Sequence, residues 1–367
     1  MKCFRSPLSI SSSAGAVVAV ALLATCIGLT PADAGPLTFN NYTTASGLGS
    51  NSVNGVYATG SAVYVATNGG VSISTNGGST YTTTSGTQTG LGSTVVNGIY
   101  RANNTVYAAT DNGVSTSTNN GATWRNLRTT IPDKVNAVYV TGSTVYAATF
   151  QNGLLVSTNG LASWTKEYNS PPLSDYYLWS VYASGSAIYA GINPYGIDVS
   201  FNGGTTWVNF YNTNKNPASP LPGDEGYGVY AVGSTIYAAT SQGLSVSLDN
   251  GANWTKYTAL NGLGNDQVNG VYAVGSTIYA ATLGGLSIST NGGANWTNYT
   301  IANGLGSNDV RDVFVDGNTI YAATAGGLSI SAVPEPSAGI LAVVGLACGG
   351  YSVFRRRRTR RTEPLAA

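Results

Sequence analysis

Apolar and polar positions repeat along this chain with a period of about 43 residues. The stretch 268–309 contains three short apolar runs, a glycine turn before Trp296, and then a polar loop. The pattern predicts a protein of seven repeated units. The first apolar run of each unit resembles VNGVY and begins near Val53, Val96, Val135, Leu178, Gly226, Val268 and Val310.

The apolar runs have the length and composition of β-strands. They are rich in Val, Ile, Tyr and Thr and are separated by Gly, Asn and Ser, whereas a helix needs ten or more residues without such breaks. In the second run of the sixth unit, Ile278 and Ala280 point to one face of the strand, and Tyr279 and Ala281 point to the other. Both faces are apolar, which is typical of a sheet packed between two other sheets.

The two ends of the repeat complement each other. The seventh unit stops after Ser331 and lacks a fourth strand, while residues 39–52, which precede the first unit, align with residues 296–309 without a gap. An open solenoid has no use for this exchange, but a ring needs it to complete its last sheet. We therefore expect an all-β, seven-bladed β-propeller that is closed by the N-terminal strand.

Six units place a glycine turn before the aromatic residue that opens their fourth strand. Residues 247–254, SLDNGANW, resemble the Asp-box hairpin of sialidase-type propellers, and Asn replaces Asp249 in the other five turns. Residues 303–310, NGLGSNDV, are similar to the repeat of two-component-regulator ligand-binding propellers. These resemblances imply a propeller fold and ligand binding, but no reaction. Because the turn recurs in nearly every blade, we interpret it as structural, with the Asp or Asn side chain accepting hydrogen bonds from turn amides.

The N-terminus has the pattern of a secretory signal peptide. Lys2 and Arg5 precede an apolar run over residues 14–29, and small residues lead to a cleavage site between Ala34 and Gly35. Residues 1–34 are therefore predicted to form a signal helix that signal peptidase removes. The alternative is a lipoprotein signal ending at Cys26.

The C-terminus carries a second, tripartite pattern. Residues 338–354 are 17 largely apolar residues, at the short end of what spans a bilayer, and are predicted to form a transmembrane helix. An arginine cluster, which should stay cytoplasmic, follows over 355–361 before the tail 362–367. The preceding box consists of Val333, Pro334, Glu335, Pro336 and Ser337. Together they resemble the PEP-CTERM sorting signal of Gram-negative bacteria, which implies processing by an exosortase and delivery to the cell surface or extracellular matrix. The alternative is a simple single-pass transmembrane anchor.

The composition of the central domain, residues 35–332, excludes several chemistries. It has eight basic and twelve acidic residues, a net charge of −4, so it offers no basic face for nucleic acid. The chain contains no histidine, and its cysteines (Cys3, Cys26 and Cys348) all lie in the terminal segments. Histidine-based nucleophile systems and histidine-ligated metals are thereby excluded, and we expect no cofactor.

Candidate functional residues gather where the repeat is broken. Most loops between a fourth strand and the next first strand have the plain GLGSN form, but residues 167–177 and 210–226 are longer and rich in Tyr, Pro and acidic residues. Aromatic rings stack on sugars and carboxylates accept their hydroxyls, so we predict a ligand site, although such loops also pack on themselves. The predicted site contains Tyr168, Asp175, Tyr176, Tyr177, Trp179, Tyr195, Tyr211, Asp224 and Glu225.

Three functions remain open at this point. The first is an exported surface or matrix propeller that binds a polysaccharide or a protein without catalysis, which we favour. The second is a propeller-type glycoside hydrolase or lyase, and the third is a purely structural matrix protein. A further departure, Arg311-Asp312 in the seventh unit, stands where other units have Asn-Gly. It is either an ion pair facing the channel or a lock that closes the ring.

Overall fold

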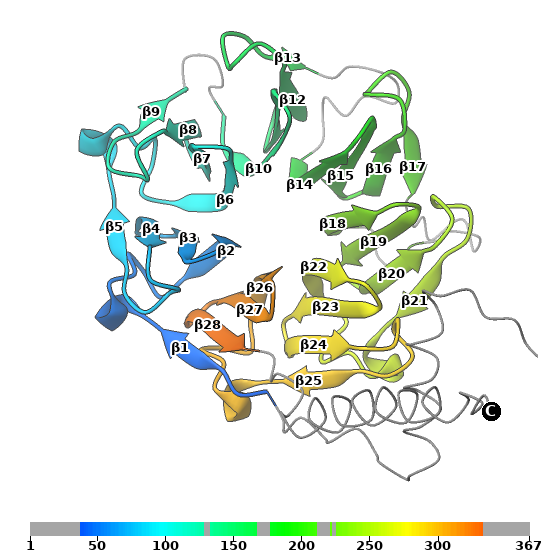
Figure 1. Cartoon of the computed structure of the whole chain (residues 1–367). Coiled ribbons are helices and arrows are strands. Elements are labelled where there is room, and N and C mark those ends of the chain that lie inside the picture. Colours follow the sequence, from blue (N-terminus) through cyan, green and yellow to red (C-terminus); the bar gives the residue numbers. More distant parts are fainter. Residues whose placement is uncertain (1–36, 128–132, 167–176, 211–220, 222–224, 333–367) are drawn as a thin grey trace, which may run out of the picture. The chain divides into compact units, whose positions relative to one another are not determined.

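Seven four-stranded antiparallel sheets follow one another along the chain as the blades of a propeller (Figure 1). This computed structural model describes residues 37–127, 133–166, 177–210, 221 and 225–332, and Thr38–Ala332 form one compact unit. The all-β, seven-bladed fold is confirmed. The signal segment, the sorting segment and the tail lie outside the described residues, within which no helix has the length and apolarity to cross a membrane.

Each blade runs from an inner strand at the central channel to an outer strand at the rim (Figure 1). The inner strands are β2 (Val53–Thr59), β6 (Val96–Ala102), β10 (Val135–Thr141), β14 (Tyr177–Ser184), β18 (Gly226–Val232), β22 (Val268–Val274) and β26 (Val310–Asp316). The second strands are β3 (Ala62–Thr67), β7 (Thr105–Thr110), β11 (Thr144–Thr149), β15 (Ala187–Asn193), β19 (Thr235–Thr240), β23 (Thr277–Thr282) and β27 (Thr319–Thr324). Blades 1 to 7 are numbered in this order.

The third and fourth strands are shorter. The third strands are β4 (Gly70–Ser74), β8 (Gly113–Ser117), β12 (Leu154–Ser157), β16 (Gly196–Ser200), β20 (Gly243–Ser247), β24 (Gly285–Ser289) and β28 (Gly327–Ala332). The outer strands of blades 1 to 6 are β5 (Thr82–Thr84), β9 (Arg125–Asn126), β13 (Thr165–Lys166), β17 (Val208–Phe210), β21 (Thr255–Tyr257) and β25 (Thr297–Tyr299). Short 3-10 helices stand in four loops between blades: η1 (Thr44–Ser46), η2 (Thr87–Thr89), η4 (Ala259–Asn261) and η5 (Ile301–Asn303).

Blade 7 is completed by the N-terminal strand β1 (Asn40–Tyr42), as the sequence predicts. β1 pairs antiparallel with β28, with Asn40 opposite Ile330 and Tyr42 opposite Leu328. The ladder therefore joins the two ends of the ring and removes the exposed sheet edge that an incomplete blade 7 would leave.

Charged side chains strengthen the junction between blades 7 and 1. Arg311 Nη1 donates to Ser52 Oγ at 2.7 Å and to Asn54 Oδ1 at 2.8 Å, while its Nε lies 3.3 Å from Asp309 Oδ2. Asp312 accepts a hydrogen bond from the backbone N–H of Val56 in blade 1 at 3.1 Å. Arg311 and Asp312 thus both contact blade 1, so their arrangement is that of a closure lock.

The core lies between neighbouring blades. One buried cluster combines Leu154 of blade 3 with Leu178, Ile192 and Trp207 of blade 4, and similar clusters fill other blade junctions. Every residue of the third strand β24 is buried, which confirms the prediction that both faces of a sheet are packed. The small Ala side chains of the second strands allow neighbouring sheets to approach closely.

The glycine turns before the fourth strands are hydrogen-bonded as their recurrence predicts. In blade 5, Asp249 Oδ1 accepts from Ser247 Oγ and from the backbone N–H of Asn253, each at 2.8 Å. In blade 1, Asn76 Oδ1 accepts from Ser74 Oγ at 2.7 Å and from the N–H of Thr80 at 3.1 Å. Asp and Asn therefore accept the same two hydrogen bonds, and these turns are structural.

The propeller has two faces of different construction. We call the face formed by the loops between blades and by the turns between second and third strands the loop face. The opposite face, formed by the other two turns of each blade, is the turn face. Each inner strand runs from the loop face to the turn face along the central channel.

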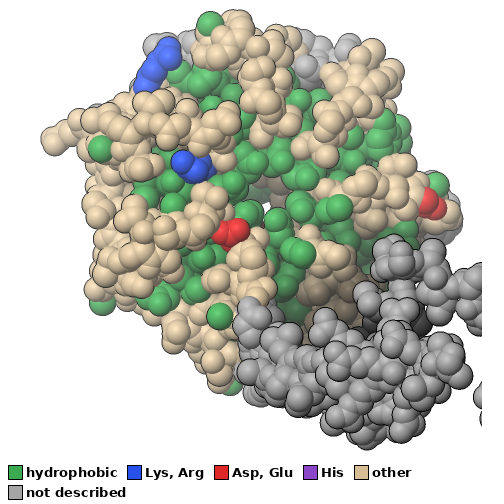
Figure 2. All heavy atoms as spheres, viewed as in Figure 1, with side chains coloured by type: hydrophobic (Ala, Val, Ile, Leu, Met, Phe, Trp, Pro, Cys, Tyr) green, Lys and Arg blue, Asp and Glu red, His purple; other side chains and the backbone are tan. Residues whose placement is uncertain are grey.

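One aromatic side chain per inner strand encircles the channel near the turn face, and neighbouring ring centroids lie 4.7 to 5.1 Å apart around the whole circle. Figure 2 shows hydrophobic side chains around a hollow at the centre of one face. We call the seven aromatic side chains of the inner strands the aromatic ring. It consists of Tyr57, Tyr100, Tyr139, Tyr182, Tyr230, Tyr272 and Phe314.

Candidate functional site

A β-bulge near the start of every inner strand sets the side chains at the loop-face end of the channel. In each blade the register shifts between the first and third residues of the VNGVY run, so its second residue is the extra one. Bulges re-aim a side chain and are common beside binding sites. Seven re-aimed side chains therefore stand around the loop-face end of the channel, one from each blade.

In five blades this bulged side chain ties one blade to the next. Asn54 donates its Nδ2 to the backbone carbonyl of Val96 in blade 2 at 2.8 Å. Asn97, Asn136 and Asn269 make the same bond to Val135, Leu178 and Val310, at 2.7 to 2.9 Å. In blade 7, Arg311 takes this role through Ser52 and Asn54. A repeated polar bridge of this kind stabilises the ring.

Blades 4 and 5 carry aromatic residues at the bulge instead. Trp179 and Tyr227 replace the asparagines, and their rings lie edge to face with centroids 6.1 Å apart. The indole Nε1 of Trp179 and the hydroxyl of the next residue, Ser180, are buried without a hydrogen-bond partner among the described residues. A buried donor that lacks a partner costs about 1–3 kcal/mol. The two blades therefore replace a stabilising bridge with aromatic surface and unused donors.

A carboxylate stands beside this aromatic pair. The hydroxyl of Tyr227 donates to Glu225 Oε2, and Asn193 Nδ2 lies 3.4 Å from Glu225 Oε1. Burial, followed by the hydrogen bond to Glu225, raises the pKa of Tyr227 above its ordinary value. The phenol therefore remains a protonated donor at neutral pH, and it holds Glu225 at the edge of the aromatic pair.

A second pair of aromatic rings extends the site toward blade 3. Tyr177 stacks on Phe150 with centroids 4.2 Å apart and an angle of 14° between the ring planes. Phe150 follows the second strand of blade 3, and Tyr177 is paired with Asn193 across β14 and β15. Tyr177 is 43% exposed, and Tyr195 on the neighbouring turn is 41% exposed. The stack and the exposed tyrosines form a surface that is open to a ligand.

Close packing between blades 4 and 5 brings these residues together. A side chain at Gly226 would meet the carbonyl oxygen of Gly196 at 1.8 Å, so only glycine allows β18 to approach blade 4 this closely. The other blades begin the same run with Val or Leu. Gly226 lies between Glu225 and Tyr227, so the close approach positions both of these site residues.

The structure places four of the nine residues that the sequence predicts for the site. Tyr177, Trp179, Tyr195 and Glu225 all belong to the loop face of blades 4 and 5. The other five lie outside the described residues: Tyr168, Asp175, Tyr176, Tyr211 and Asp224. We call Phe150, Tyr177, Trp179, Ser180, Asn193, Tyr195, Glu225 and Tyr227 the loop-face site.

Sequence analysis missed some members of the loop-face site. Tyr227 stands at the second position of its VNGVY-like run, as Trp179 does, so an alignment of the runs identifies it as a departure too. Phe150 lies in a turn that departs from the repeat, a signal that was available. Asn193 likewise lies in a turn that departs from the repeat, whereas Ser180 is recognisable only through its unpartnered hydroxyl.

The described part of the site is suited to binding. It offers two aromatic pairs and one carboxylate acceptor, which together match a ligand with apolar faces and hydroxyl groups. Glycoside hydrolysis commonly uses two carboxyl groups about 5–9.5 Å apart, and Glu225 is the only carboxylate among the described residues of this site. Within the described ranges no three Asp, Glu, His or Cys side chains gather as metal ligands do.

In sequence, the chain matches no protein-family model and no curated protein. Its fold is similar to several solved structures. The extracellular domain of BT4673 from B. thetaiotaomicron superposes with a TM-score of 0.65 at 15% identity, over 81% of this chain and 40% of that one.

Two further solved structures have a similar fold. YCF48 bound to D1 peptide has a TM-score of 0.62 at 12% identity, over 83% of this chain and 98% of that one. An ancestral GH74 enzyme has a TM-score of 0.60 at 18% identity, over 81% of this chain and 45% of that one. At these identities the comparisons show the propeller fold alone.

Proposed function

We propose that this protein is an exported, non-catalytic propeller that binds a polysaccharide through its loop-face site. The observation that carries the proposal is the replacement of two bridging asparagines by Trp179 and Tyr227. Stability alone favours the bridge, so a chain that gives it up in two adjacent blades has a different use for that position.

Carbohydrate is the ligand class that fits the chemistry of the loop-face site. Aromatic faces pack on the C–H surfaces of sugar rings, while the Glu225 carboxylate accepts hydrogen bonds from their hydroxyl groups. The predicted loops 167–177 and 210–226 adjoin these residues in sequence and contain further tyrosines and carboxylates. A protein ligand is the alternative.

The positions of the described chain ends support this choice of face. β28 ends at Ala332 and β1 begins at Asn40, and both of these ends belong to the turn face. The predicted signal peptide and the PEP-CTERM-like pattern continue the chain beyond these two ends. Attachment through the C-terminal segment, before exosortase processing, would leave the loop face free for a ligand at the cell surface or in an extracellular matrix.

A binding screen tests the proposal. Residues 35–332, which contain the closed ring, are applied to an array of bacterial polysaccharides and to the polysaccharide of the producing organism. We expect saturable binding of at least one polysaccharide and no release of reducing sugar. Release of reducing sugar would instead identify a hydrolase, and the absence of any binding would favour a purely structural matrix protein.

A further inference from the structure

The turn-face end of the channel has a local departure of its own. Two residues after the aromatic ring, each inner strand ends in a rim residue, which is small or polar in five blades: Thr59, Ala102, Thr141, Ser184 and Asp316. In blades 5 and 6 the rim residues are Val232 and Val274, which are 53% and 51% exposed. These exposed valines do not serve the core, because more than half of each lies in water.

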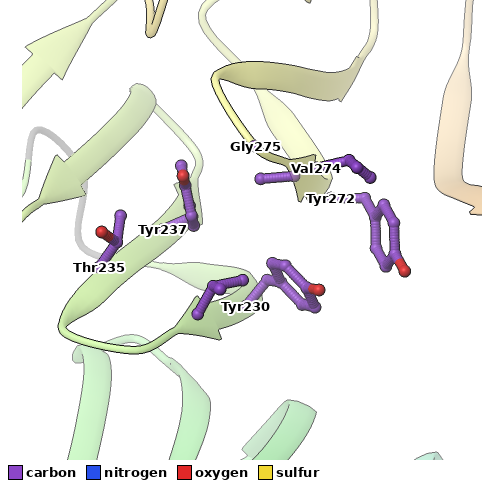
Figure 3. Close-up of a pocket in the computed structure, with 8 residues that line it drawn as sticks. Tyr230, Thr235, Tyr237, Tyr272, Val274 and Gly275 are labelled. Carbon is purple, nitrogen blue, oxygen red and sulfur yellow. The ribbon is translucent and has the colours of Figure 1, made fainter. Parts of the chain in front are cut away.

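The two valines flank a cavity. It has a volume of about 370 Å³ and lies between blades 5 and 6, where Tyr230, Tyr237, Tyr272 and Thr235 are among the residues that line it (Figure 3). No charged side chain lines it. The volume falls within the range of pockets that hold small ligands, about 300–1,000 Å³. The walls thus combine apolar carbon with neutral hydroxyls.

The tyrosines of the cavity keep their protons. Burial raises the pKa of Tyr230, Tyr237 and Tyr272 above the ordinary value, and a side-chain hydrogen bond joins Tyr230 to Tyr272. A neutral phenol both donates and accepts, so these groups can pair with ligand hydroxyls. An uncharged wall offers nothing to neutralise a charged ligand, which disfavours acidic sugars.

Exposed apolar surface continues outward from the cavity. Ser234, on the turn that joins β18 to β19, donates to the carbonyl oxygen of Leu248 at 2.9 Å, so the Leu248 turn lies beside the cavity's rim. Leu248 is 72% exposed, and the equivalent residue is Thr in four other blades. Phe201 occupies this place in blade 4 and is 39% exposed, so Leu248 adds apolar surface beside the cavity at a position that blade 4 also alters.

We propose that the turn-face cavity between blades 5 and 6 is a second saccharide site, which takes a neutral sugar residue with its apolar face on Val232 and Val274 and its hydroxyls on the tyrosines. β18 carries Tyr227 at one end and Tyr230 at the other, so one strand serves both faces. The propeller then holds two saccharide chains on opposite faces and cross-links them. This inference goes beyond the proposed function, which concerns the loop face.

Titration calorimetry with residues 35–332 and neutral gluco-, manno-, galacto- and xylo-oligosaccharides tests the proposal. We expect two equivalents of sugar per protein. Tyr272→Phe should weaken one of the two about tenfold, because it removes one hydroxyl from the cavity wall. Phe already occupies this ring position as Phe314, so the variant should fold. The matched control, Tyr57→Phe, removes a hydroxyl from the same ring away from the cavity and should change neither site.

Two more variants separate this proposal from the proposed function. Val232→Thr with Val274→Thr restores the rim of other blades and should weaken the turn-face site alone. Trp179→Asn with Tyr227→Asn should abolish the loop-face site and leave one equivalent bound.

Two results would overturn the second site only. One is saturation at a single equivalent that the loop-face variant abolishes, and the other is unchanged affinity in Tyr272→Phe. Loss of all binding in the turn-face variants, with the loop-face variant unaffected, would contradict the loop-face proposal only. A wild-type protein that binds no neutral sugar, or that binds an apolar peptide at the cavity instead, overturns the second site.

Discussion

At the scale of single residues, one strand position has two uses. The bulged second residue of the VNGVY run bridges to the next blade in five blades, through Asn54, Asn97, Asn136, Asn269 and Arg311. In blades 4 and 5 the same backbone geometry presents Trp179 and Tyr227 at the end of the channel. The bulge is a feature of the fold, and the residue that occupies it decides between stabilisation and recognition.

Truncation of Tyr177 should separate binding from stability. Tyr177→Ala removes a 43% exposed ring that stacks on Phe150, so we expect polysaccharide affinity to fall about tenfold. The melting temperature should change by no more than a few degrees, because little core is lost. Tyr42→Ala is the contrasting control. It removes a ring of the closing blade that packs on Tyr81 of blade 1, so it should lower the melting temperature without affecting binding. Unaltered affinity in Tyr177→Ala would remove the stack from the site.

Asp198 should make stability depend on pH. This residue replaces the serine of five other third strands and is 2% exposed. Burial raises its pKa to about 7, while a hydrogen bond from Asn209 lowers it. Its folded pKa lies above the unfolded value, so it stabilises the fold below about pH 4 and this contribution is lost as the pH rises through 7. Relative to Asp198→Asn, the wild type should lose roughly 3–4 kcal/mol of unfolding free energy between pH 4 and 8.

Urea unfolding at a series of pH values measures this difference. Asp198→Asn keeps an oxygen that can accept from Asn209, so the comparison isolates ionisation from packing. A difference between the two proteins that stays constant from pH 4 to pH 8 would show that Asp198 does not change its ionisation in that range.

At the scale of elements, the closing blade differs from the other six. Its outer strand comes from the other end of the chain, and the junction with blade 1 carries Arg311, Asp312 and Asp316, each of which contacts blade 1. The β1–β28 ladder alone is three residue pairs long. The side-chain bonds therefore add to a short ladder at the point where the ring is joined.

Removal of the Arg311 side chain should weaken closure. Arg311→Ala deletes the bonds to Ser52 and Asn54, and hydrogen bonds of charged groups contribute about 1.5–3 kcal/mol. Because Arg311 is partly exposed, we expect a loss near the lower end of this range in chemical unfolding. Arg125→Ala, on the exposed outer strand of blade 2, is the matched control and should be nearly neutral. Equal effects of the two substitutions would argue against a closure lock.

The fold was more predictable than the site, for a physical reason. Seven copies of one pattern give strand period, blade number and closure through residues 39–52 independently of any single residue, and all three agree with the structure. The site depends on single departures and on contacts between blades, which no local pattern encodes. Trp179 was visible as a departure, whereas the unused hydroxyl of Ser180 and the position of Glu225 beside Tyr227 follow from how blades 4 and 5 pack.

At the scale of the whole molecule, blades 1, 2 and 6 keep the regular pattern at the loop face, and the departures at the loop-face site gather in blades 3 to 5. Blade 7 also departs from the repeat, because it closes the ring. In our account, the ring is a rigid support, the terminal segments determine where the protein goes, and the loop face recognises the ligand.

The most direct test of this account restores the repeat. Trp179→Asn with Tyr227→Asn supplies the side chains that bridge four other blades, so we expect a melting temperature equal to or above that of the wild type. In the same protein, binding to the polysaccharide that the wild type recognises through its loop face should be lost. A restored variant that keeps loop-face binding, or one that unfolds well below the wild type, would contradict the account.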